Sequence, residues 1–455
     1  MVKIRRNAVN HIEVAIVGGG ITGVILALAL QKRNVSYKLY ERAPAFTEIG
    51  AGIGFSPNAE RALQVVDPAV YKLYKSVAST NPDIEWFTWI DGNRTNKIIT
   101  QLEIGVDAFQ GGRRSDFLEA WSKLIPTGKV GFNREIESIV QRDEEGGGRA
   151  VMKFRDGSIE EADVVIGCDG IRSRVRQLIL GEANPASYPR YTQKFCYRAL
   201  VPMDHALPIL GPERTRYRFM YNGQDAHGIT YSVAQGKLLN ILFVVTDKEP
   251  WTAERHIAPG SREDLAKALR GWHPNGIRGL IDLLPERLDK WAIFDMHEHP
   301  APYYNAGSVA IAGDAAHASG PHLGSGAGFG IEDALVLAVI LKQADEKVAS
   351  IGGRDAESVG ERTIKGNGKQ KNKSKVQICR DALAAYNDVR FARGQWLPGA
   401  TREAVELFQW QDPKVADDGG KLYPRVHSLY HTIWDNDIDE MVRDAENRFR
   451  VVVER

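Results

Sequence analysis

Cysteine and long apolar runs are the scarcest features of this sequence. It contains only three cysteines, Cys168, Cys196 and Cys379, and they are far apart. Their spacing matches neither a metal site nor a disulfide framework, so we expect a reducing compartment. No apolar stretch approaches the roughly 20 residues that a membrane span requires. The sequence therefore predicts a protein with neither structural disulfides nor membrane-spanning helices.

A charge excess of either sign is absent too. Lysine and arginine number 59 against 58 aspartates and glutamates, which gives a net charge of +1. This balance predicts no nucleic-acid partner and no membrane partner. Basic residues near the N-terminus precede an apolar run, but Glu13 and several glycines interrupt it, so we reject a signal peptide and expect a cytoplasmic protein. A chain of 455 residues has room for two or three domains.

Residues 11–42 carry a strand, a glycine-rich turn, a helix and a second strand that ends at Glu41. Gly18, Gly20 and Gly23 form the G-x-G-x-x-G dinucleotide fingerprint in the context that it requires. Gly18 permits the tight turn, Gly20 lets backbone approach a pyrophosphate, and Gly23 lets the helix pack against the strand. Glu41 is placed to accept hydrogen bonds from ribose hydroxyls. The stretch predicts a bound dinucleotide, either FAD or NAD.

Two further glycine-rich segments flank this region. Residues 49–54, which end at Gly54, predict a loop that lets backbone approach a flat ligand, with a surface loop as the alternative. Asn58 is a candidate cap for the next helix. Arg114 follows two glycines and precedes a helix with Ser115 as its expected N-cap. That arginine is a candidate phosphate or carboxylate ligand, or else a solvated cation.

In the middle of the chain, apolar and polar residues alternate as they do in β-strands. Residues 130–166 predict a β-meander. A strand at 164–167 leads into Asp169 and Gly170, and a basic helix with Arg172, Arg174 and Arg176 is expected to follow. Strand-like runs at 84–90, 195–201, 226–233 and 237–245 follow the same two-residue period. We expect the last three to form one antiparallel sheet.

The C-terminal third contains a second informative stretch. Residues 308–312 predict a strand, Gly313 and Asp314 a turn, 321–330 a glycine-rich loop and 331–343 an apolar helix. Residues 350–375 are almost free of apolar side chains, which predicts a mobile or disordered loop; a nuclear-localisation signal is the alternative. Helical periodicity returns from residue 376.

Three motifs in this order resemble those of the group A flavoprotein aromatic hydroxylases, which have the para-hydroxybenzoate hydroxylase fold. They are the fingerprint with Glu41, the Asp169-Gly170 motif, and the Gly313-Asp314 motif with Pro321. Within that family the sequence looks closest to salicylate hydroxylase-like enzymes and to fungal phenol-dearomatising monooxygenases of polyketide pathways. The similarity extends along most of the chain.

The resemblance implies an α/β protein with a Rossmann-like FAD-binding domain, an antiparallel-sheet substrate domain and C-terminal helices. The FAD-binding domain would be discontinuous, and the substrate domain would be inserted into it. The expected FAD-binding segments are 1–80, 108–190 and 291–346, the substrate-domain segments are 81–107 and 191–290, the mobile polar loop is 347–375, and the helical region is 376–455.

Residue roles follow by motif from the same resemblance. Asp314 would bond the ribityl or ribose part of FAD, Arg114 its ribose–phosphate region, and Asp169 both FAD and the pyridine nucleotide. Pro321 would pack near the flavin ring. The amides of Gly326, Ala327 and Gly328 would face the flavin N1–C2=O edge, where a helix N-terminus stabilises the negative charge of reduced flavin.

The implied reaction uses NADPH or NADH, molecular oxygen and a small phenol, through a C4a-hydroperoxyflavin. The protein then has to bind a phenolate and aim one of its carbons at the activated oxygen. Arg198 lies in an otherwise apolar strand and is a candidate partner of the phenolate. His227 and Tyr231 are four residues apart on a strand and so share one face. His322 follows Pro321 and is a further candidate.

Alternatives to these assignments remain open at this point. Arg198 and Tyr231 could instead be a paired core arginine and an ordinary sheet tyrosine. The reaction could be phenol hydroxylation with or without dearomatisation, salicylate-type hydroxylation with or without decarboxylation, or a flavin dehydrogenase or oxidase reaction; a non-catalytic FAD-bound relative is the last possibility. Residues 297–299 hold two histidines and a glutamate on one short segment without a partner, so we expect no metal site.

Overall fold

The computed structural model describes residues 11–46, 52–79, 83–106, 108–143, 148–357 and 373–454, apart from the side chains of 352–357. Its first sheet has the order β18-β19-β11-β1-β2-β7 and is parallel except for β18. The strands are β1 (Glu13–Val17), β2 (Ser36–Tyr40), β7 (Val130–Gly131), β11 (Val164–Gly167), β18 (Asn305–Ala306) and β19 (Val309–Ile311). The predicted Rossmann-like half is confirmed.

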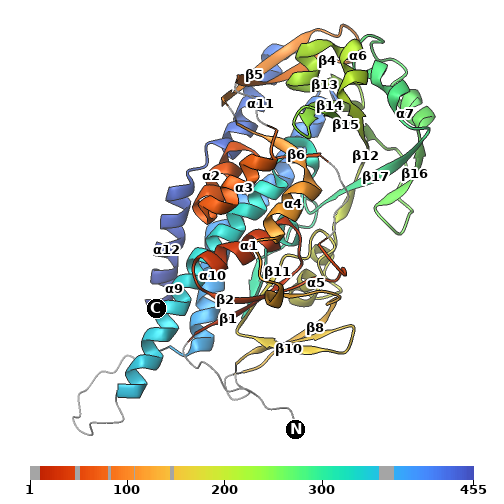
Figure 1. Ribbon diagram of the computed structural model, residues 1–455. Coiled ribbons are helices and arrows are strands. Elements are labelled where there is room, and N and C mark those ends of the chain that lie inside the picture. The colour runs from red at the N-terminus through yellow and green to blue at the C-terminus, as the bar shows by residue number, and fades with distance from the viewer. Residues whose placement is uncertain are drawn as a thin grey trace.

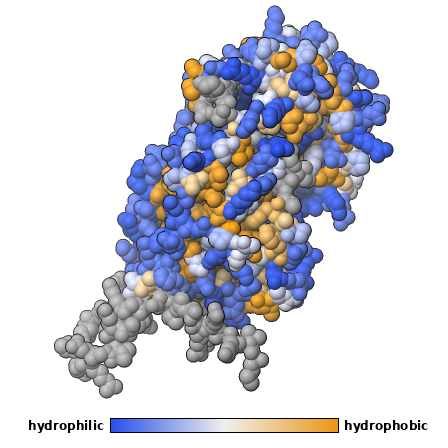
Figure 2. All heavy atoms as spheres, viewed as in Figure 1, coloured by the Kyte–Doolittle hydropathy of each residue, from blue (hydrophilic) through white to orange (hydrophobic). Residues whose placement is uncertain are grey.

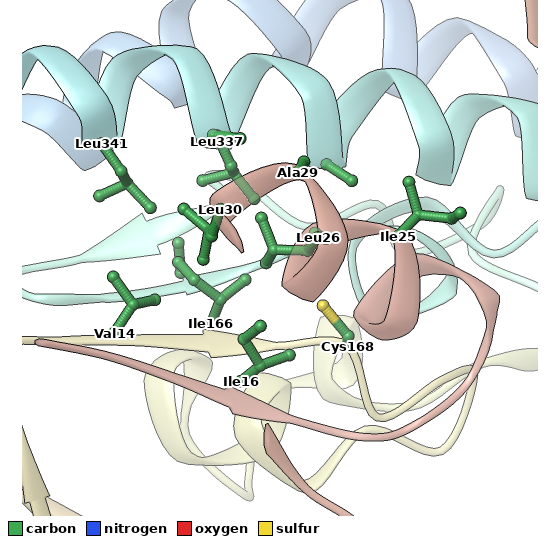
Figure 3. Close-up of a cluster of buried hydrophobic side chains, with 14 of the residues drawn as sticks. Val14, Ile16, Ile25, Leu26, Ala29, Leu30, Ile166, Cys168, Leu337 and Leu341 are labelled. Atoms are coloured by element: carbon green, nitrogen blue, oxygen red, sulfur yellow. The ribbon is translucent and has the colours of Figure 1, made fainter. Parts of the chain in front are cut away.

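Helix α1 (Ile21–Lys32) is apolar around its whole circumference because it is covered on both sides. One side of α1 packs on β1 and β2, and the other packs on α9 (Gly326–Glu357). Figure 3 shows Leu26 and Leu30 between the sheet residues Val14 and Ile166 and the α9 residues Leu337 and Leu341. This sandwich holds the glycine turn that precedes α1 against the ends of the strands.

Smaller elements surround this core. The short ribbon of β3 (Gly52–Gly54) and β6 (Gly111–Arg113) lies beside α4 (Arg114–Ser122), while α2 (Pro57–Val66) packs against α9 and α3 (Pro68–Val77) against α2 and α4. The predicted meander contributes a separate sheet of β8 (Ile136–Gln141), β9 (Ala150–Phe154) and β10 (Ile159–Ala162), and α5 (Arg174–Leu180) follows β11. Two short 3-10 helices are η1 (Thr127–Lys129) and η2 (Pro185–Ser187).

Four helix starts differ from the sequence-based expectation. Helix α9 begins at Gly326, five residues before the predicted start, so the end of the predicted glycine-rich loop is helical. Ser56, not Asn58, occupies the N-cap of α2, because Pro57 begins the helix; Asn58 is buried and donates to Glu332 at 2.7 Å. Helix α4 begins one residue before Ser115. In α5, Ser173 caps the first turn by accepting from the Arg176 amide, so Arg172 lies outside the helix.

The second sheet forms the other end of the molecule (Figure 1). It has eight strands in the order β16-β17-β12-β15-β14-β13-β4-β5. The three strands that were expected to share a sheet are joined by β4, which was also predicted as a strand, and by β5, β13, β16 and β17. Their bounds are β4 (Ile84–Asp91), β5 (Ile98–Val106), β12 (Arg190–Pro202), β13 (Arg218–Gly223), β14 (Ala226–Val233), β15 (Leu238–Thr246), β16 (Ile257–Ser261) and β17 (Arg287–Asp295). One face of the sheet is covered by α6 (Met203–Arg216), α7 (Arg262–Ala268) and η3 (Ile277–Leu283).

The strand register determines which side chains share the opposite face. Arg198 pairs with Leu242, and Leu242 pairs in turn with Ile229. Tyr231 pairs with Asn240. Because side chains alternate along a strand, all five point to one face, which is turned toward the Rossmann-like half.

Long helices join the two halves along one side of the molecule (Figure 1). These are α9, α10 (Lys375–Phe408), α11 (Gly419–Trp434) and α12 (Ile438–Glu454), together with the short α8 (Asp314–His317) and η4 (Pro321–Leu323). Helix α9 continues to Glu357, so the first part of the predicted polar loop is helical. Residues 358–372 of that loop and 49–51 of the glycine-rich loop lie outside the described residues.

The surface is mainly polar, with apolar residues interspersed on the face that Figure 2 shows. Within the described ranges, none of the helices is both long enough and apolar enough to cross a bilayer.

Candidate active site

A cavity of about 310 Å³ lies between the two halves and is called here the main cavity. Its walls come from the start of α1, strand β3, the face of the large sheet that carries Arg198 and Tyr231, and residues 319–327. The predicted site residues that line it are Gly20, Gly54, Arg114, Arg198, Tyr231, Asp314, Pro321, His322, Gly326 and Ala327. Residues that are remote in the sequence therefore meet around one space.

A second cavity of about 510 Å³, the nucleotide cavity, continues past the glycine turn. It shares Gly20, Cys168 and Gly170 with the main cavity and is also lined by Gly18, Glu41 and Asp169. Glu41 Oε2 accepts from the Gly19 amide at 2.6 Å. The carboxylate therefore lies beside the turn, where a ribose hydroxyl can reach it.

The glycine turn fits a dinucleotide by its geometry. Gly18 has φ +108°, and a Cβ there would lie 2.4 Å from the Cys168 carbonyl oxygen; a Cβ on Gly23 would lie 2.0 Å from the Gly18 oxygen. At Gly20 no atom of the described residues lies within 4 Å of such a Cβ, so the space in front of it is open. Helix α1 has neither a side-chain cap nor an acidic residue in its first turn. Its free amides can therefore bind a pyrophosphate.

Asp314 and the start of α9 form the opposite wall. Asp314 opens α8 with an exposed carboxylate, and Gly313 before it has φ +61°. Helix α9 begins at Gly326 with no acidic residue in its first turn, so its amides are available to an anionic group. Gly328 does not line the main cavity, because its Cα faces Ala59 and Ser56.

Asp169 has a local task in addition to lining the nucleotide cavity. Its carboxylate accepts from the Ser173 hydroxyl at 2.5 Å and from the Val175 amide at 3.0 Å, and so it fixes the start of α5. Burial raises the pKa of Asp169, although these hydrogen bonds oppose the shift.

Tyr231 and Asn240 converge on the β3 backbone. A Cβ on Gly52 would lie 2.5 Å from Asn240 Oδ1 and 2.8 Å from the Tyr231 hydroxyl, so a side chain at Gly52 would collide with both. Burial raises the pKa of Tyr231 to about 12, although Arg218 and Arg198 oppose the rise. Tyr231 is therefore a neutral hydroxyl donor at physiological pH, with two cations near it.

The two candidate histidines occupy different layers. His322 lines the main cavity, whereas His227 is 1% exposed and does not line it. The two rings lie 5.3 Å apart, and the Gln409 side chain is 3.2 Å from His227 Nδ1. Burial lowers the pKa of His227 to about 3 and that of His322 well below its usual range. Both rings are therefore neutral, and His227 backs His322.

Sequence reasoning missed several wall residues. Arg218, Phe87 and Asn240 line the main cavity from the large sheet, and Tyr430 lines it from α11. Arg218 begins β13, a short strand that was not predicted; its signal was the aromatic residues at every second position, Tyr217, Phe219 and Tyr221. Tyr430 comes from a helix whose position relative to the sheet is a tertiary property.

Asp333 was also missed, although it supports the predicted turn. It accepts from the Gly313 amide at 2.8 Å, and its other oxygen accepts from Arg390 Nε at 2.7 Å. His317 Nε2 lies 2.6 Å from the same carboxylate. Although burial raises it, contacts with His317 and Arg390 hold the pKa of Asp333 below its usual range.

Comparison with known proteins agrees with this geometry. The family model described as "FAD binding domain" matches residues 11–350. FAD-dependent monooxygenase pigN of Monascus ruber is 44% identical over 447 residues, which are 97% of each chain. The chain belongs to the FAD-dependent aromatic hydroxylases.

Other relatives place this hydroxylase within the family. Salicylate hydroxylase asL1 of Sarocladium schorii is 36% identical, with 96% of this chain and 91% of the relative covered. The solved structure of a salicylate hydroxylase substrate complex superposes with a TM-score of 0.79 and 28% identity, over 96% of this chain and 98% of the other. The hydroxylase is thus a flavin monooxygenase of the salicylate hydroxylase type.

Proposed function

We propose that this monooxygenase hydroxylates a substituted phenol with NADPH or NADH and molecular oxygen, with or without dearomatisation, in fungal secondary metabolism. The observation that carries the proposal is the main cavity, in which Arg198 and Tyr231 on the large sheet face Asp314 and residues 319–327. A cation and a neutral hydroxyl on one wall fit a phenolate, and the opposite wall fits a flavin.

FAD would lie across the nucleotide and main cavities. Gly18, Gly20 and Glu41 would hold its adenosine and pyrophosphate, with Gly23 allowing α1 to pack closely behind the turn. Asp314 and Arg114 would hold the sugar parts. When bound, FAD would accept the electrons of NADPH or NADH and activate molecular oxygen with them, while the protein would supply binding, orientation and electrostatics.

The chain's own residues account for the substrate side of the reaction. Arg198 would lower the pKa of the phenol by pairing with its anion, because an opposite charge favours the ionised form. Tyr231 keeps its proton, since its pKa is about 12, and would donate a hydrogen bond to the same oxygen. Phe87, Ile229 and Leu242 would exclude water and hold the ring at a fixed angle.

A salicylate-type reaction is the second candidate. It is favoured by Arg218, a second guanidinium on the wall of the main cavity, because a carboxylate beside the phenol would find a partner there. Carbon dioxide release with each hydroxylation would support decarboxylative hydroxylation, whereas retention of the carboxylate would support simple hydroxylation.

The test is turnover of a panel of resorcinol aldehydes, salicylates and indoles under ¹⁸O₂, read by mass spectrometry. We expect one labelled oxygen in the product and stoichiometric NADPH or NADH oxidation. A dehydrogenated product without label would indicate the dehydrogenase or oxidase alternative. Flavin that no pyridine nucleotide reduces with any phenol would indicate a non-catalytic relative.

Arg198→Ala tests the assignment of the phenolate partner. We expect kcat/KM for the best substrate to fall by about 10²–10³, the scale for removing one electrostatic stabiliser of a reacting oxygen. Arg190→Ala is the matched control, since Arg190 is an exposed arginine on the same strand, outside the main cavity. Full turnover by Arg198→Ala would exclude this role.

Tyr231→Phe separates hydrogen bonding from ring packing at the same position. We expect a smaller fall in kcat/KM, by about tenfold, because one neutral hydrogen bond is lost while the ring remains. Tyr191→Phe serves as its control, because the Tyr191 hydroxyl bonds Asp247, and neither residue lines the main cavity. Equal rates for Tyr231→Phe and the native enzyme would remove Tyr231 from the mechanism.

A further inference from the structure

A third cavity, of about 190 Å³ and called here the side cavity, adjoins the main cavity. Phe109, Arg218 and Tyr231 line both spaces and form the partition between them. The remaining wall of the side cavity is made by Ser79, Glu85, Gln110, Gly111, Arg216, Tyr217, Ser232, Gln235 and Gly236. A group attached to a ring in the main cavity would reach the side cavity by passing this partition.

Arg218 has unused hydrogen-bonding capacity at the partition. It is 8% exposed, and its Nη2 donates to the Phe109 carbonyl. Among the described residues its Nη1 has no hydrogen-bond partner; Glu85 Oε2, the nearby carboxylate oxygen, is 3.9 Å away, beyond hydrogen-bond distance. A buried donor without an acceptor is costly, so an acceptor supplied by a ligand would be bound well here.

Phe109 is held in a conformation that phenylalanine rarely adopts. Its φ is +54°, in the left-handed region. The Arg218 guanidinium lies 4.4 Å from the centre of its ring and also bonds its carbonyl. Strain of this kind persists where surrounding structure enforces it, and it is concentrated at ligand sites. Arg218 thus fixes the shape of the partition.

We propose that the phenol substrate carries an arm with a carbonyl oxygen, that this oxygen accepts from Arg218 Nη1, and that the rest of the arm occupies the side cavity. The inference rests on the proposed function. For an arm that enters the side cavity, which Glu85 lines, a neutral carbonyl fits better than a carboxylate, because Glu85 would repel a second anion there; a carboxylate on the ring itself would stay in the main cavity, which Glu85 does not line. The arm, rather than a ring substituent alone, follows from the empty volume beyond the partition.

Two fixed points would then orient the ring. Arg198 and Tyr231 hold the phenol oxygen, and Arg218 holds the arm, so rotation of the ring within the main cavity is prevented. The carbon that faces the flavin is therefore set by the distance between the phenol oxygen and the arm carbonyl. Arg218 would be a specificity-determining residue of this monooxygenase.

Binding to the FAD-loaded full chain, without NADPH or NADH, tests the proposal apart from turnover. Dissociation constants are read from the change in flavin absorbance for three probes: resorcinol, 4-pentylresorcinol and 1-(2,4-dihydroxyphenyl)pentan-2-one. The last two differ only by one carbonyl oxygen on arms of equal length. We expect the ketone to bind about tenfold more tightly than the alkyl probe, as for a hydrogen bond to a charged donor.

Two variants and a control sharpen the result. In Arg218→Met the ratio of the dissociation constants of the alkyl probe and the ketone should fall to about one. In the control Arg270→Met, at an exposed arginine after α7, this ratio should stay at about ten. Ser232→Leu narrows the side cavity without touching the partition. It should raise the dissociation constants of 4-pentylresorcinol and the ketone, the two probes that carry an arm, and leave that of resorcinol unchanged. If Arg218→Met fails to bind FAD, Ser232→Leu still tests the proposal.

Equal binding of the two armed probes by the native protein, or a preference that survives Arg218→Met, would overturn the proposal. So would Ser232→Leu weakening resorcinol as much as the armed probes. In any of these cases phenol hydroxylation can still be measured, and the proposed function stands. If no phenol perturbs the flavin or accelerates NADPH or NADH oxidation, the proposed function fails as well.

Discussion

Asp333 shows how single residues hold this site together. Its carboxylate is completely buried and joins three separate segments: the Gly313 amide before α8, His317 within α8, and Arg390 on α10. A buried charge is tolerated only when it is paired and hydrogen-bonded on all sides. The network therefore stabilises the Gly313–Asp314 turn from beneath, and no residue in it needs to touch the substrate.

Asp333→Asn should destabilise the protein strongly, because it removes the buried negative charge and replaces one of the two acceptor oxygens with an NH₂ donor, which faces either the Gly313 amide and His317, or Arg390. We expect a loss of about 3–5 kcal/mol in the free energy of unfolding, measured with urea. The control is Asp388→Asn on helix α10, where the pair with Arg448 is substantially exposed. Breaking that surface pair should cost about 0–1 kcal/mol. Similar losses in the two variants would contradict the assigned role of Asp333.

The pH dependence of this effect follows from the lowered pKa of Asp333. A carboxyl whose pKa is lower in the folded protein contributes stability above its unfolded pKa of about 4 and loses it as the pH falls below that value. The difference in unfolding free energy between the native protein and Asp333→Asn should therefore be constant from pH 7 to 5 and narrow between about pH 4 and 3. A difference that is unchanged at pH 3 would refute this.

At the scale of elements, the glycine turn before α1 depends on two close backbone contacts. Gly18→Ala would place a side chain at φ +108° and 2.4 Å from the Cys168 carbonyl oxygen. The conformation alone costs about 1–2 kcal/mol, which is roughly a tenfold change in an equilibrium. We expect at least that loss of FAD affinity, measured by fluorescence of released flavin. Gly128→Ala is the control, because its Cβ would meet no atom of the described residues within 4 Å.

The large sheet shows what strand patterns do and do not predict. Residues 195–201, 226–233 and 237–245 alternate clearly, and apart from Lys237, in the turn before β15, they lie in strands of one sheet, as expected. That alternation also places His227 and Tyr231 on one face. The pattern does not show, however, which element covers that face. His227 was therefore expected to line the cavity, whereas His322 lies against it and lines the cavity instead.

At the scale of the whole molecule, the three cysteines are internal probes of folding. Cys168, Cys196 and Cys379 are 7%, 0% and 1% exposed. Burial raises the pKa of each thiol, and that of Cys379 to about 12. Because the thiolate is the reactive form, none should react quickly with a disulfide reagent at pH 8 in the FAD-loaded protein. All three should react in guanidinium chloride.

Removal of FAD should change this pattern in one place. Cys168 borders both the main and the nucleotide cavity, whereas the other two thiols border neither. In the FAD-free protein we expect Cys168 to be labelled first, as identified by peptide mass spectrometry. Labelling of Cys196 or Cys379 as fast as Cys168 would show general loosening instead of an uncovered cavity.

The sequence alone determined the Rossmann-like turn, because a close approach of two backbone segments requires glycine at fixed positions. The spacing of these glycines is read directly from the amino-acid sequence. The motifs at Asp169 and Asp314 are local in the same way, and so are the apolar helix and the alternating strands. Each of these signals depends on neighbours within a few residues, so no long-range contact is needed to recognise it.

Only the tertiary structure decided which residues form the walls of the cavities. Arg218 lies at the start of a short strand, and it meets Phe109 and Tyr231 because β13 pairs with β14 and β6, which follows Phe109, lies against β14. Asp333 meets Gly313 and Arg390 only when α9 and α10 pack together. Such contacts join residues that are tens of positions apart or more, and the order of strands and helices that brings them together is absent from any local pattern.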